Sequence, residues 1–376
     1  MTGIYAEIGA GLWNGARAAA AEINAQGGVL GNKIHLVQID DADDPADAVT
    51  ALDTAIATNH IVALDGSEST VLPAIEPIVT ENHIPEMFQG GTTAFNTNTN
   101  KWVWRPSPSD SSLGVAMAAY ALSKHYKRAA ILFTQNASAG TLSVQVKQTF
   151  TQNGGKIVSD QLITPGASSY ASVVEAVVSS HPQVIFTQTD PTSGATIWKN
   201  FQQIDSLAIP FVGSDLTAGS DFISAIGASV AQKSLLSVQG TTSSGPGVAP
   251  FVKYYKQLFH ATPISGANYS YDAILEFALA IQEAGSTNGA KIDAAIAKVS
   301  NPPGVDVSTW SAGLKDLKAK KKVHFVGAGG PAGFNQYHNS VGTFGAFRAN
   351  ADGSLTSVAN LSVGTLAKAA SGQLHP

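Results

Sequence analysis

The chain contains no cysteine among its 376 residues. This absence excludes disulfides, thiolate nucleophiles and cysteine metal sites together. Charged residues make up only 13%, and the net charge of −5 comes without a sustained basic stripe, so nucleic acid is not expected as a partner. No window approaches the roughly 18 consecutive apolar residues of a membrane span.

Motifs of catalysis and metal binding are also missing. The nine histidines include no HExxH pair, and no GxSxG nucleophile elbow occurs. The acidic run from Asp40 to Asp47 lacks the glycine and the glutamate of a calcium loop counted from Asp41, since Ala46 and Leu52 stand at the sixth and twelfth positions. Helix capping is the favoured role of these acids. We therefore expect no metal, no cofactor and no enzymatic activity.

The stretch from Ile61 to Thr93 reads as a βαβ unit. An apolar run stops at a Gly/Ser/Thr turn, a helix-length segment follows, and a second short run after Pro85 stops at GGTT. A chain of this length is expected to form two domains, with an α/β architecture of two Rossmann-like lobes and parallel central sheets.

A second copy of this pattern begins at Val184 and continues through Phe211 into GSDLTAGS. The likeness extends upstream, because NAQGG before Lys33 resembles TQNGG before Lys156. The landmarks repeat at a nearly constant spacing of about 125 residues, which indicates two lobes of the same internal architecture. The alternative is that any two βαβ stretches look alike.

Other segments predict helices, strands and hairpins around these two copies. Residues 11–25 carry an apolar stripe at helical spacing, and 33–39 alternate as a strand. Further downstream, 128–133 and 156–163 read as strands, and the glycine-rich part after Val323 reads as β-hairpins.

Hydroxyl groups, free N–H groups and acids gather where the strands of both copies end. In an open parallel sheet these ends meet at the edge where ligands bind. Hydroxyls and N–H groups suit a carboxylate, and a carbonyl with an aspartate suits an ammonium, so the set predicts a zwitterion site. Taken singly, each residue also fits a turn or helix-cap role. The residues are Ser67, Ser69, Thr70, Gly90, Gly91, Thr92, Ser138, Thr189, Asp190 and Asp215.

Two glycine-rich stretches allow a different class of function. Gly9, Gly11 and Gly15 precede a helix, with Asp40 after the next predicted strand, so an NAD(P)-dependent oxidoreductase is the alternative from another class. The stretch from Gly327 to Gly333 is a weaker candidate, because hairpin patterning follows it instead of a helix.

The chain resembles the substrate-binding proteins of branched-chain amino acid ABC transporters, the Leu/Ile/Val-binding group of the type I periplasmic binding fold. The resemblance runs nearly end to end. It rests on GLWNGARAAAAEINAQGGVLGNKIHLVQIDDADDP, GSEST, MFQGGTT, WRPSPSDSSLG, IPFVGSD and GPAGFNQYHNSVG.

The resemblance implies two lobes joined by a three-crossover hinge, with the ligand cleft between them. The first lobe would comprise residues 1–110 and 241–338, and the second 111–240 and 339–376. The family has a strand before the loop that begins at Thr2, and this sequence starts at that loop without a signal peptide, so the first strand is expected to be missing.

The resemblance also implies roles for individual residues. Ser67 and Thr92 would bind an α-carboxylate, the carbonyl of Gly90 would take the ammonium, and Asp215 would complete the ammonium site from the other lobe. Tyr5 or Ile8 would line the cleft. The family has pocket tyrosines near Ser138 and near Thr189 or Asp190, where this chain has none, so the side-chain pocket differs.

The function that follows is capture of a small amino acid or amide-like ligand for delivery to an ABC permease. The protein is then expected to be a periplasmic or extracytoplasmic monomer. A sensor of the same fold that reports its ligand to a regulator is the related alternative.

Overall fold

The computed structural model describes residues 6–135, 137–240, 245–264, 266–340 and 342–374, without the side chains of residues 137–139. The chain divides into two compact units and passes between them three times. Unit 1 consists of residues 1–109 and 241–342, and unit 2 of residues 110–240 and 343–376.

Two of the expected lobe boundaries need correction. Residues 339–342 belong to unit 1, where Ser340 N–H donates to the Arg105 carbonyl at 2.9 Å and the Asn339 side chain donates to the Phe95 carbonyl at 3.1 Å. Asp110 belongs to unit 2, because it opens the first helix there. The hydrogen bonds of residues 339 and 340 join positions far apart in the sequence, which sequence patterns do not reveal.

Unit 1 contains two small sheets and seven of the described α-helices. Its elements in chain order are α1 (Ala6–Ala25), α2 (Pro45–Asn59), β1 (Leu64–Asp65), α3 (Leu72–Glu81), β2 (Glu86–Met87), η2 (Thr93–Thr97), β3 (Val103–Trp104), α10 (Val248–Phe259), α11 (Ala267–Ala284), α12 (Gly289–Ser300), β9 (Val305–Val307), α13 (Trp310–Lys318), β10 (Val323–Gly327) and β11 (Gly330–Pro331).

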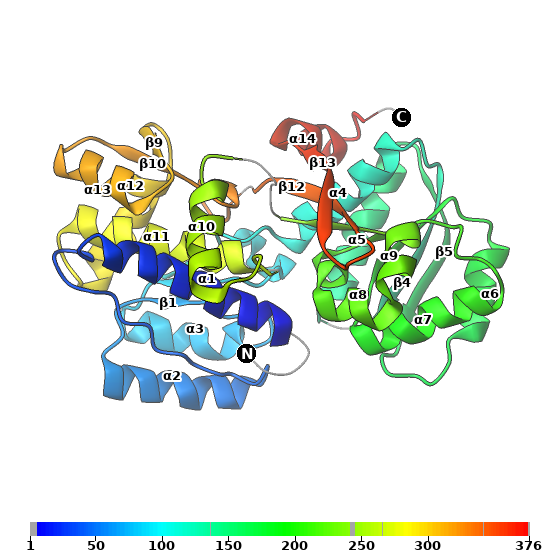
Figure 1. Cartoon of the computed structure of the whole chain (residues 1–376), viewed down its shortest axis with the longest axis horizontal. Coiled ribbons are helices and arrows are strands. Elements are labelled where there is room, and N and C mark those ends of the chain that lie inside the picture. Colours follow the sequence, from blue (N-terminus) through cyan, green and yellow to red (C-terminus); the bar gives the residue numbers. More distant parts are fainter. Residues whose placement is uncertain (1–5, 136, 241–244, 265, 341, 375–376) are drawn as a thin grey trace. The chain divides into compact units, whose positions relative to one another are not determined.

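The centre of unit 1 is the contact between α1 and α11, which lie side by side (Figure 1). Small residues permit this approach, since a Cβ atom added to Gly15 would lie 1.9 Å from the carbonyl oxygen of Ala267. Ala18, Ala19 and Ala278 are fully buried in the surrounding core. Helix packing therefore holds this unit together where its sheet is short.

The main sheet of unit 1 is parallel with the order β1-β2-β3, and each of its strands is two residues long. The expected strand at Lys33–Ile39 is wrong: the segment runs back from α1 as a blue trace without an arrow (Figure 1). The reason is pairing, because among the described residues no neighbouring strand supplies a ladder of hydrogen bonds to it.

Unit 2 contains one larger sheet with helices on both faces. Its elements are α4 (Asp110–Ser123), β4 (Arg128–Thr134), α5 (Ala137–Gln152), β5 (Lys156–Ile163), α6 (Ala171–Ser179), β6 (Val184–Gln188), α7 (Pro191–Gln203), β7 (Phe211–Gly213), η3 (Asp215–Ala218), α8 (Ser220–Ile226), α9 (Ala228–Ser234), β8 (Leu235–Gln239), β12 (Phe344–Ala349), β13 (Leu355–Leu361) and α14 (Val363–Ala370).

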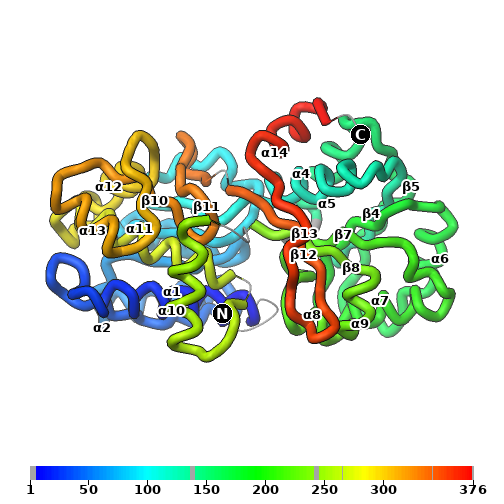
Figure 2. The backbone as a smooth tube through the Cα atoms, turned by 45° about the horizontal axis from the view of Figure 1, so that its top comes forward, coloured from blue at the N-terminus to red at the C-terminus, as the bar shows by residue number. Residues whose placement is uncertain are grey.

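The seven strands of this sheet follow the order β13-β12-β8-β7-β6-β4-β5. The five strands from β8 to β5 are parallel, whereas β12 and β13 are antiparallel and return from the end of the chain beside β8 (Figure 2). One face packs on α4, α5 and α14, and the other on α6, α7 and α8. Burial on both faces explains the continuous apolar runs of β4 and β6.

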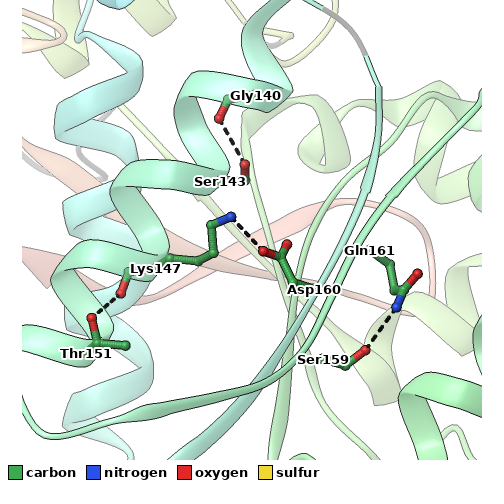
Figure 3. A network of polar contacts seen from close by, with 7 residues as sticks. All are labelled: Gly140, Ser143, Lys147, Thr151, Ser159, Asp160 and Gln161. Atoms are coloured by element: carbon green, nitrogen blue, oxygen red, sulfur yellow. Dashed lines mark hydrogen bonds and ion pairs between the residues drawn. The ribbon is translucent and has the colours of Figure 1, made fainter.

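The outer parallel strand β5 carries charges along its length. Lys147 of α5 points to Asp160 of β5, with Nζ 2.7 Å from the carboxylate (Figure 3). Charged side chains on an edge strand discourage pairing with another chain. The two βαβ copies, β1-α3-β2 and β6-α7-β7, are both parallel pairs, so the α/β class is confirmed, and the internal repetition stays a prediction.

Candidate functional site

The polar strand ends of unit 1 come together in one cluster. The turn after β1 carries Ser67 and Ser69, and the turn after β2 carries Gly90 and Thr92. Thr92 N–H donates to Ser69 Oγ at 3.2 Å, which joins the two turns directly. The prediction that these positions are neighbours is therefore correct, because β1 and β2 are adjacent parallel strands.

Gly90 is the residue that lets the two turns approach each other. A Cβ atom at this position would lie 2.6 Å from Ser69 N and 2.5 Å from the ring of Phe88. The half-buried Gly91 follows it, and Thr92 then caps the short helix η2 by accepting the N–H of Ala94 at 3.3 Å. Gly90 therefore permits the close packing of the two turns.

Ser67 is buried and shares a hydrogen bond with Glu86, a fully buried acid of β2. Burial raises the pKa of the Glu86 carboxyl to about 8, which exceeds the opposing effect of the bond with Ser67. Glu86 is therefore mostly protonated at neutral pH. Ser67 Oγ donates this hydrogen bond to the carboxyl oxygen of Glu86.

Sequence patterns did not indicate three residues that support the strand-end cluster of unit 1. Besides Glu86, Gln89 donates to the Asp65 carboxylate at 2.7 Å, and the buried Arg105 donates to the Thr92 carbonyl at 2.8 Å. Arg105 belongs to the quoted connector WRPSPSDSSLG. Its signal was an arginine directly after an apolar strand, where a charge is seldom found unless it is paired.

A second cluster lies at the carboxyl ends of β6 and β7 in unit 2. Thr189 and Asp190 follow β6, Asp215 follows β7, and the two strands are hydrogen-bonded neighbours. The structure thus brings these three predicted residues to one edge of one sheet. Unit 1 and unit 2 each hold a polar strand-end cluster.

The three residues differ in what their side chains already do. Thr189 is fully buried, and Asp190 caps α7 by accepting the Ser193 N–H at 2.9 Å. Asp215 accepts the Leu216 N–H at 3.0 Å, and burial raises the pKa of its carboxyl to about 6. Among the described residues, Asp215 interacts with backbone N–H groups and Ser214, none of which is a cation.

Two predicted site residues cannot be placed. Tyr5 lies outside the described residues. Ser138 falls in the first turn of α5, but its side chain also lies outside the described part. Ile8, the alternative to Tyr5, is part of α1.

The two dinucleotide look-alikes have other roles. Gly9, Gly11 and Gly15 are inside α1, so no loop precedes a helix N-terminus there, and Gly15 packs against α11. In the stretch from Gly327, the N–H groups of Ala328 and Gly329 donate to the buried Asp272 at 2.8 and 2.7 Å. Neither stretch has the strand–turn–helix geometry that cradles a pyrophosphate.

The acidic run after residue 39 acts in helix capping, as predicted. Asp44 precedes α2 and accepts the N–H groups of Ala46 and Asp47 at 2.8 and 3.2 Å. Across the described residues, no group of three or more His, Asp or Glu side chains could hold a metal ion. None of the described helices is long and apolar enough to cross a membrane.

The polar strand ends in two α/β units fit a family of ligand-binding proteins, and residues 1–312 match the family described as periplasmic binding protein. The chain belongs to the periplasmic binding protein family. An amino acid binding protein of Pseudomonas aeruginosa is 26% identical over 298 residues, which cover 77% of this chain and 78% of that protein. A Leu/Ile/Val-binding protein of Rhizobium johnstonii is 25% identical over 342 residues, covering 86% and 91%.

Solved structures of periplasmic binding proteins share the fold. The branched-chain amino acid substrate-binding protein LivJ of Streptococcus pneumoniae, in complex with isoleucine, gives a TM-score of 0.80 at 20% identity over 96% of this chain and 95% of that chain. A solute-binding protein of R. palustris in complex with benzoate gives 0.76 at 19% identity over 96% and 93%. The predicted resemblance and fold class are confirmed.

Proposed function

We propose that this periplasmic binding protein captures a small amino acid or a related amide-like solute between its two units and delivers it to an ABC importer. Unit 1 would bind the carboxylate through Ser67 and the donors around Thr92, with the Gly90 carbonyl facing the ammonium. Asp215 of unit 2 would bind the ammonium. The lobe arrangement with a ligand cleft between the units is part of this proposal.

The observation that carries the proposal is the contrast between the two clusters. Asp215 is an acid whose pKa is raised by burial and whose described partners include no cation, so an ammonium group would compensate it. In unit 1, burial raises the pKa of Glu86 to about 8, so its neutral form places no buried negative charge beside the strand-end cluster that would bind an anion. A zwitterion matches both features.

The names of relatives support the same ligand class. Two relatives are named for amino acid or Leu/Ile/Val binding, and one structural neighbour holds isoleucine. Another neighbour holds benzoate, which has a carboxylate and no ammonium. Asp215 favours the amino acid, because a ligand without a cation would leave this acid uncompensated.

The test is calorimetric titration of Leu, Ile, Val, smaller amino acids, their amides, benzoate and NADH into the purified protein. Asp215→Asn should weaken binding of the preferred amino acid by about 30-fold or more, the loss typical of truncating one partner of a buried charge pair. Asp205→Asn, an exposed acid of unit 2, is the matched control and should bind like wild type. If the Asp215→Asn variant binds the amino acid as tightly as wild type, or if benzoate alone binds, the proposed ammonium site is wrong.

Delivery and location are separate parts of the proposal. We place the protein outside the cytoplasm as a monomer that docks on a membrane permease and performs no catalysis. Reconstituted permease should hydrolyse ATP faster when the liganded protein is added. A ligand-dependent response of a regulator with no effect on ATP hydrolysis would favour the sensor instead, and turnover of NADH would favour an oxidoreductase.

A further inference from the structure

A run of five lysines lies at the end of α13 in unit 1. All five are exposed, and they are Lys315, Lys318, Lys320, Lys321 and Lys322. They make up 5 of the 22 Lys and Arg residues of a chain whose net charge is −5. Positive charge that is concentrated in one place, against the sign of the whole chain, creates a local potential that attracts anionic partners.

The end of the helix holds the run in one conformation. Lys321 N–H donates to the Asp316 carbonyl at 3.0 Å, and Lys320 N–H donates to the Leu317 carbonyl at 2.9 Å. These two bonds form a Schellman motif, in which Lys320 takes the left-handed position with a φ of 56°. Directly after the run, Val323 is fully buried in β10. The lysines are therefore presented on a fixed surface.

Most of this positive charge is uncompensated. Asp316 is the acid within the run, and its carboxylate lies 3.0 Å from Lys321 Nζ. Across the described residues, the other four lysines form no ion pair. The nearby acid Asp306 of β9 pairs with His324, whose Nδ1 lies at 2.8 Å. With five positive charges and one negative charge, the eight residues from Lys315 to Lys322 carry a net charge of +4.

Helix stability explains only two of the five lysines. Lys315 and Lys318 lie in the last turn of α13, where the helix dipole favours positive charge. Lys320 and Lys322 lie beyond the helix, and their side chains make no hydrogen bond or ion pair within the described part of the chain. Glycine would adopt the left-handed backbone of Lys320 at a lower cost. The contacts within the fold therefore do not account for the charges after the helix.

An exposed apolar segment borders the lysines. Val305 opens β9 and is 44% exposed, and its N–H donates to the Lys322 carbonyl at 2.9 Å. Pro303 is exposed as well, and a Cβ atom on Gly304 would lie 2.4 Å from the Val323 carbonyl oxygen. The segment thus lies beside the end of the run, as α13, β9 and β10 lie together (Figure 1). We call the five lysines with Pro303 and Val305 the lysine surface.

The chemistry of the lysine surface favours a membrane over a protein or a nucleic acid. Interfaces between proteins are depleted in lysine and enriched in arginine, and the run contains no arginine. Lysine is a compact, hydrated point charge, which suits a diffuse layer of headgroups without fixed geometry. The apolar residues beside it would gain from the boundary between headgroups and acyl chains, which a phosphate backbone does not offer.

We propose that the lysine surface binds the headgroups of an anionic phospholipid bilayer. Each lysine near such a bilayer contributes roughly fivefold to the binding constant, and the attraction falls off within about 10 Å at 0.1 M salt. Binding of this strength is reversible, so it concentrates the protein at a membrane without fixing it there. No residue of the lysine surface belongs to the strand-end clusters, and the proposal does not depend on the solute site.

The test is sedimentation of the full chain with phospholipid vesicles. Vesicles of equal parts phosphatidylglycerol and phosphatidylcholine should bind the protein at low salt, and vesicles of phosphatidylcholine alone should not. Binding to the anionic vesicles should weaken steeply as the salt concentration is raised, because the ions screen the attraction.

Two triple variants with the same loss of charge locate the binding surface. The test variant combines Lys315→Gln, Lys318→Gln and Lys322→Gln. It should bind anionic vesicles about 100-fold more weakly, since each lysine contributes roughly fivefold. The control variant changes three exposed lysines of unit 2 and should bind like wild type; it combines Lys199→Gln, Lys233→Gln and Lys368→Gln.

Four results would overturn the proposal. The first two are no binding of wild type to the anionic vesicles and equal binding to phosphatidylcholine alone. The third is an equal loss in both triple variants, which would reflect the total charge of the chain. The fourth is tighter binding to poly-glutamate or to a short DNA duplex than to the vesicles, which would indicate an acidic protein or a nucleic acid as the partner.

Two checks separate a loss of charge from a loss of structure. Circular dichroism of both triple variants shows whether each is folded. A third variant that combines Lys315→Arg, Lys318→Arg and Lys322→Arg keeps all the charges and should bind the anionic vesicles like wild type. Loss of binding in this arginine variant would mean that charge is not what the vesicles recognise.

Discussion

Units 1 and 2 contain the same βαβ pattern and yet build sheets of different extent. Strand β6 pairs on both sides and is five residues long, whereas β1 pairs, within the described part of the chain, only with β2 and is two residues long. The apolar runs that precede both turns have similar length in the sequence. The difference teaches that the pattern determines the order of elements, while strand length depends on the neighbours that supply hydrogen bonds.

Unit 1 depends more on helix packing than unit 2 does. Gly15 of α1 meets the backbone of α11, which cannot move aside without displacing the whole helix. In unit 2 the comparable contact, at Gly114 of α4, is less tight, because an added Cβ atom would lie 2.8 Å from Cβ of Gln145 and 3.1 Å from the backbone nitrogen of Val146. Equivalent substitutions should therefore have unequal effects.

The largest effect is expected for Gly15→Val. The added side chain would force α1 and α11 apart, so we expect a loss of about 3 kcal/mol or more in the free energy of unfolding of unit 1, at or above the usual range for overpacking. Hydrogen exchange measured by mass spectrometry should show faster exchange in α1 and α11 while β4 and β6 stay protected.

Gly140→Ala is the matched control for this prediction, because nothing lies within 4 Å of a Cβ atom there. It should leave exchange in both units close to wild type. Unchanged protection of α11 in Gly15→Val would mean that the two helices can separate at little cost. Uniform loss of protection in both units would mean that they unfold together.

The two units also differ in buried acids. In unit 1, burial raises the pKa of Asp65 to about 6, of Asp272 to about 7, and of Glu86 and Glu276 to about 8. In unit 2, burial raises the pKa of Asp215 to about 6. The stability of unit 1 should consequently depend more on pH.

The expected direction follows from the proton balance of Glu86. Its pKa is raised from 4.5 to about 8 in the folded state, so the folded protein holds the proton more tightly than the unfolded chain does. The resulting stabilisation is full below pH 4.5 and is lost as the pH rises towards 8. One such group changes the free energy of unfolding by at most about 1.4 kcal/mol per pH unit.

Glu86→Gln tests this difference between the units. Glutamine has a similar shape and no ionisable proton, so the decline of unit 1 stability between pH 5 and 8 should become shallower by up to about 1.4 kcal/mol per pH unit. Exposed Glu175 of α6 supplies the control variant Glu175→Gln. Identical slopes in wild type and Glu86→Gln would show that Glu86 is ionised in the folded protein.

Local patterns predicted most of the fold. The helix ending at Ala25, the strand over Lys156–Ile163 and the order of both βαβ copies agree with the structure, because apolar periodicity and Gly turns determine them locally. The strand expected at residues 33–39 was wrong for the opposite reason. Alternating side chains make a strand possible, and only a partner forms one.

The sequence predicted where the candidate site lies, but it predicted less well which contacts support the residues of the site. Parallel neighbouring strands bring Ser69 to Thr92 and Asp190 to Asp215, and sheet topology alone predicts this. The sequence did not reveal that Glu86 supports Ser67 or that Arg105 holds the Thr92 carbonyl. Those contacts join residues of different strands and depend on burial, for which a single sequence has no local signal.

The smallest effect is expected at the exposed edge of the unit 2 sheet. Lys147 and Asp160 form an ion pair of 2.7 Å, but their side chains are 30% and 44% exposed, so water screens the attraction. Lys147→Met and Asp160→Asn should give a coupling energy of about 0.2–1 kcal/mol in a double-mutant cycle. The Lys321–Asp316 pair of unit 1, at 3.0 Å, should give a similar value.

Such equality would sharpen the comparison between the units. Surface ion pairs would then contribute equally to the stability of both units. Any difference in stability between the units would come from strand pairing and from the buried acids. A coupling energy well above 1 kcal/mol at Lys147 alone would instead mean that this pair holds β5 to the sheet. In that case the ion pair, in addition to the seven residue pairs with β4, would determine the length of β5.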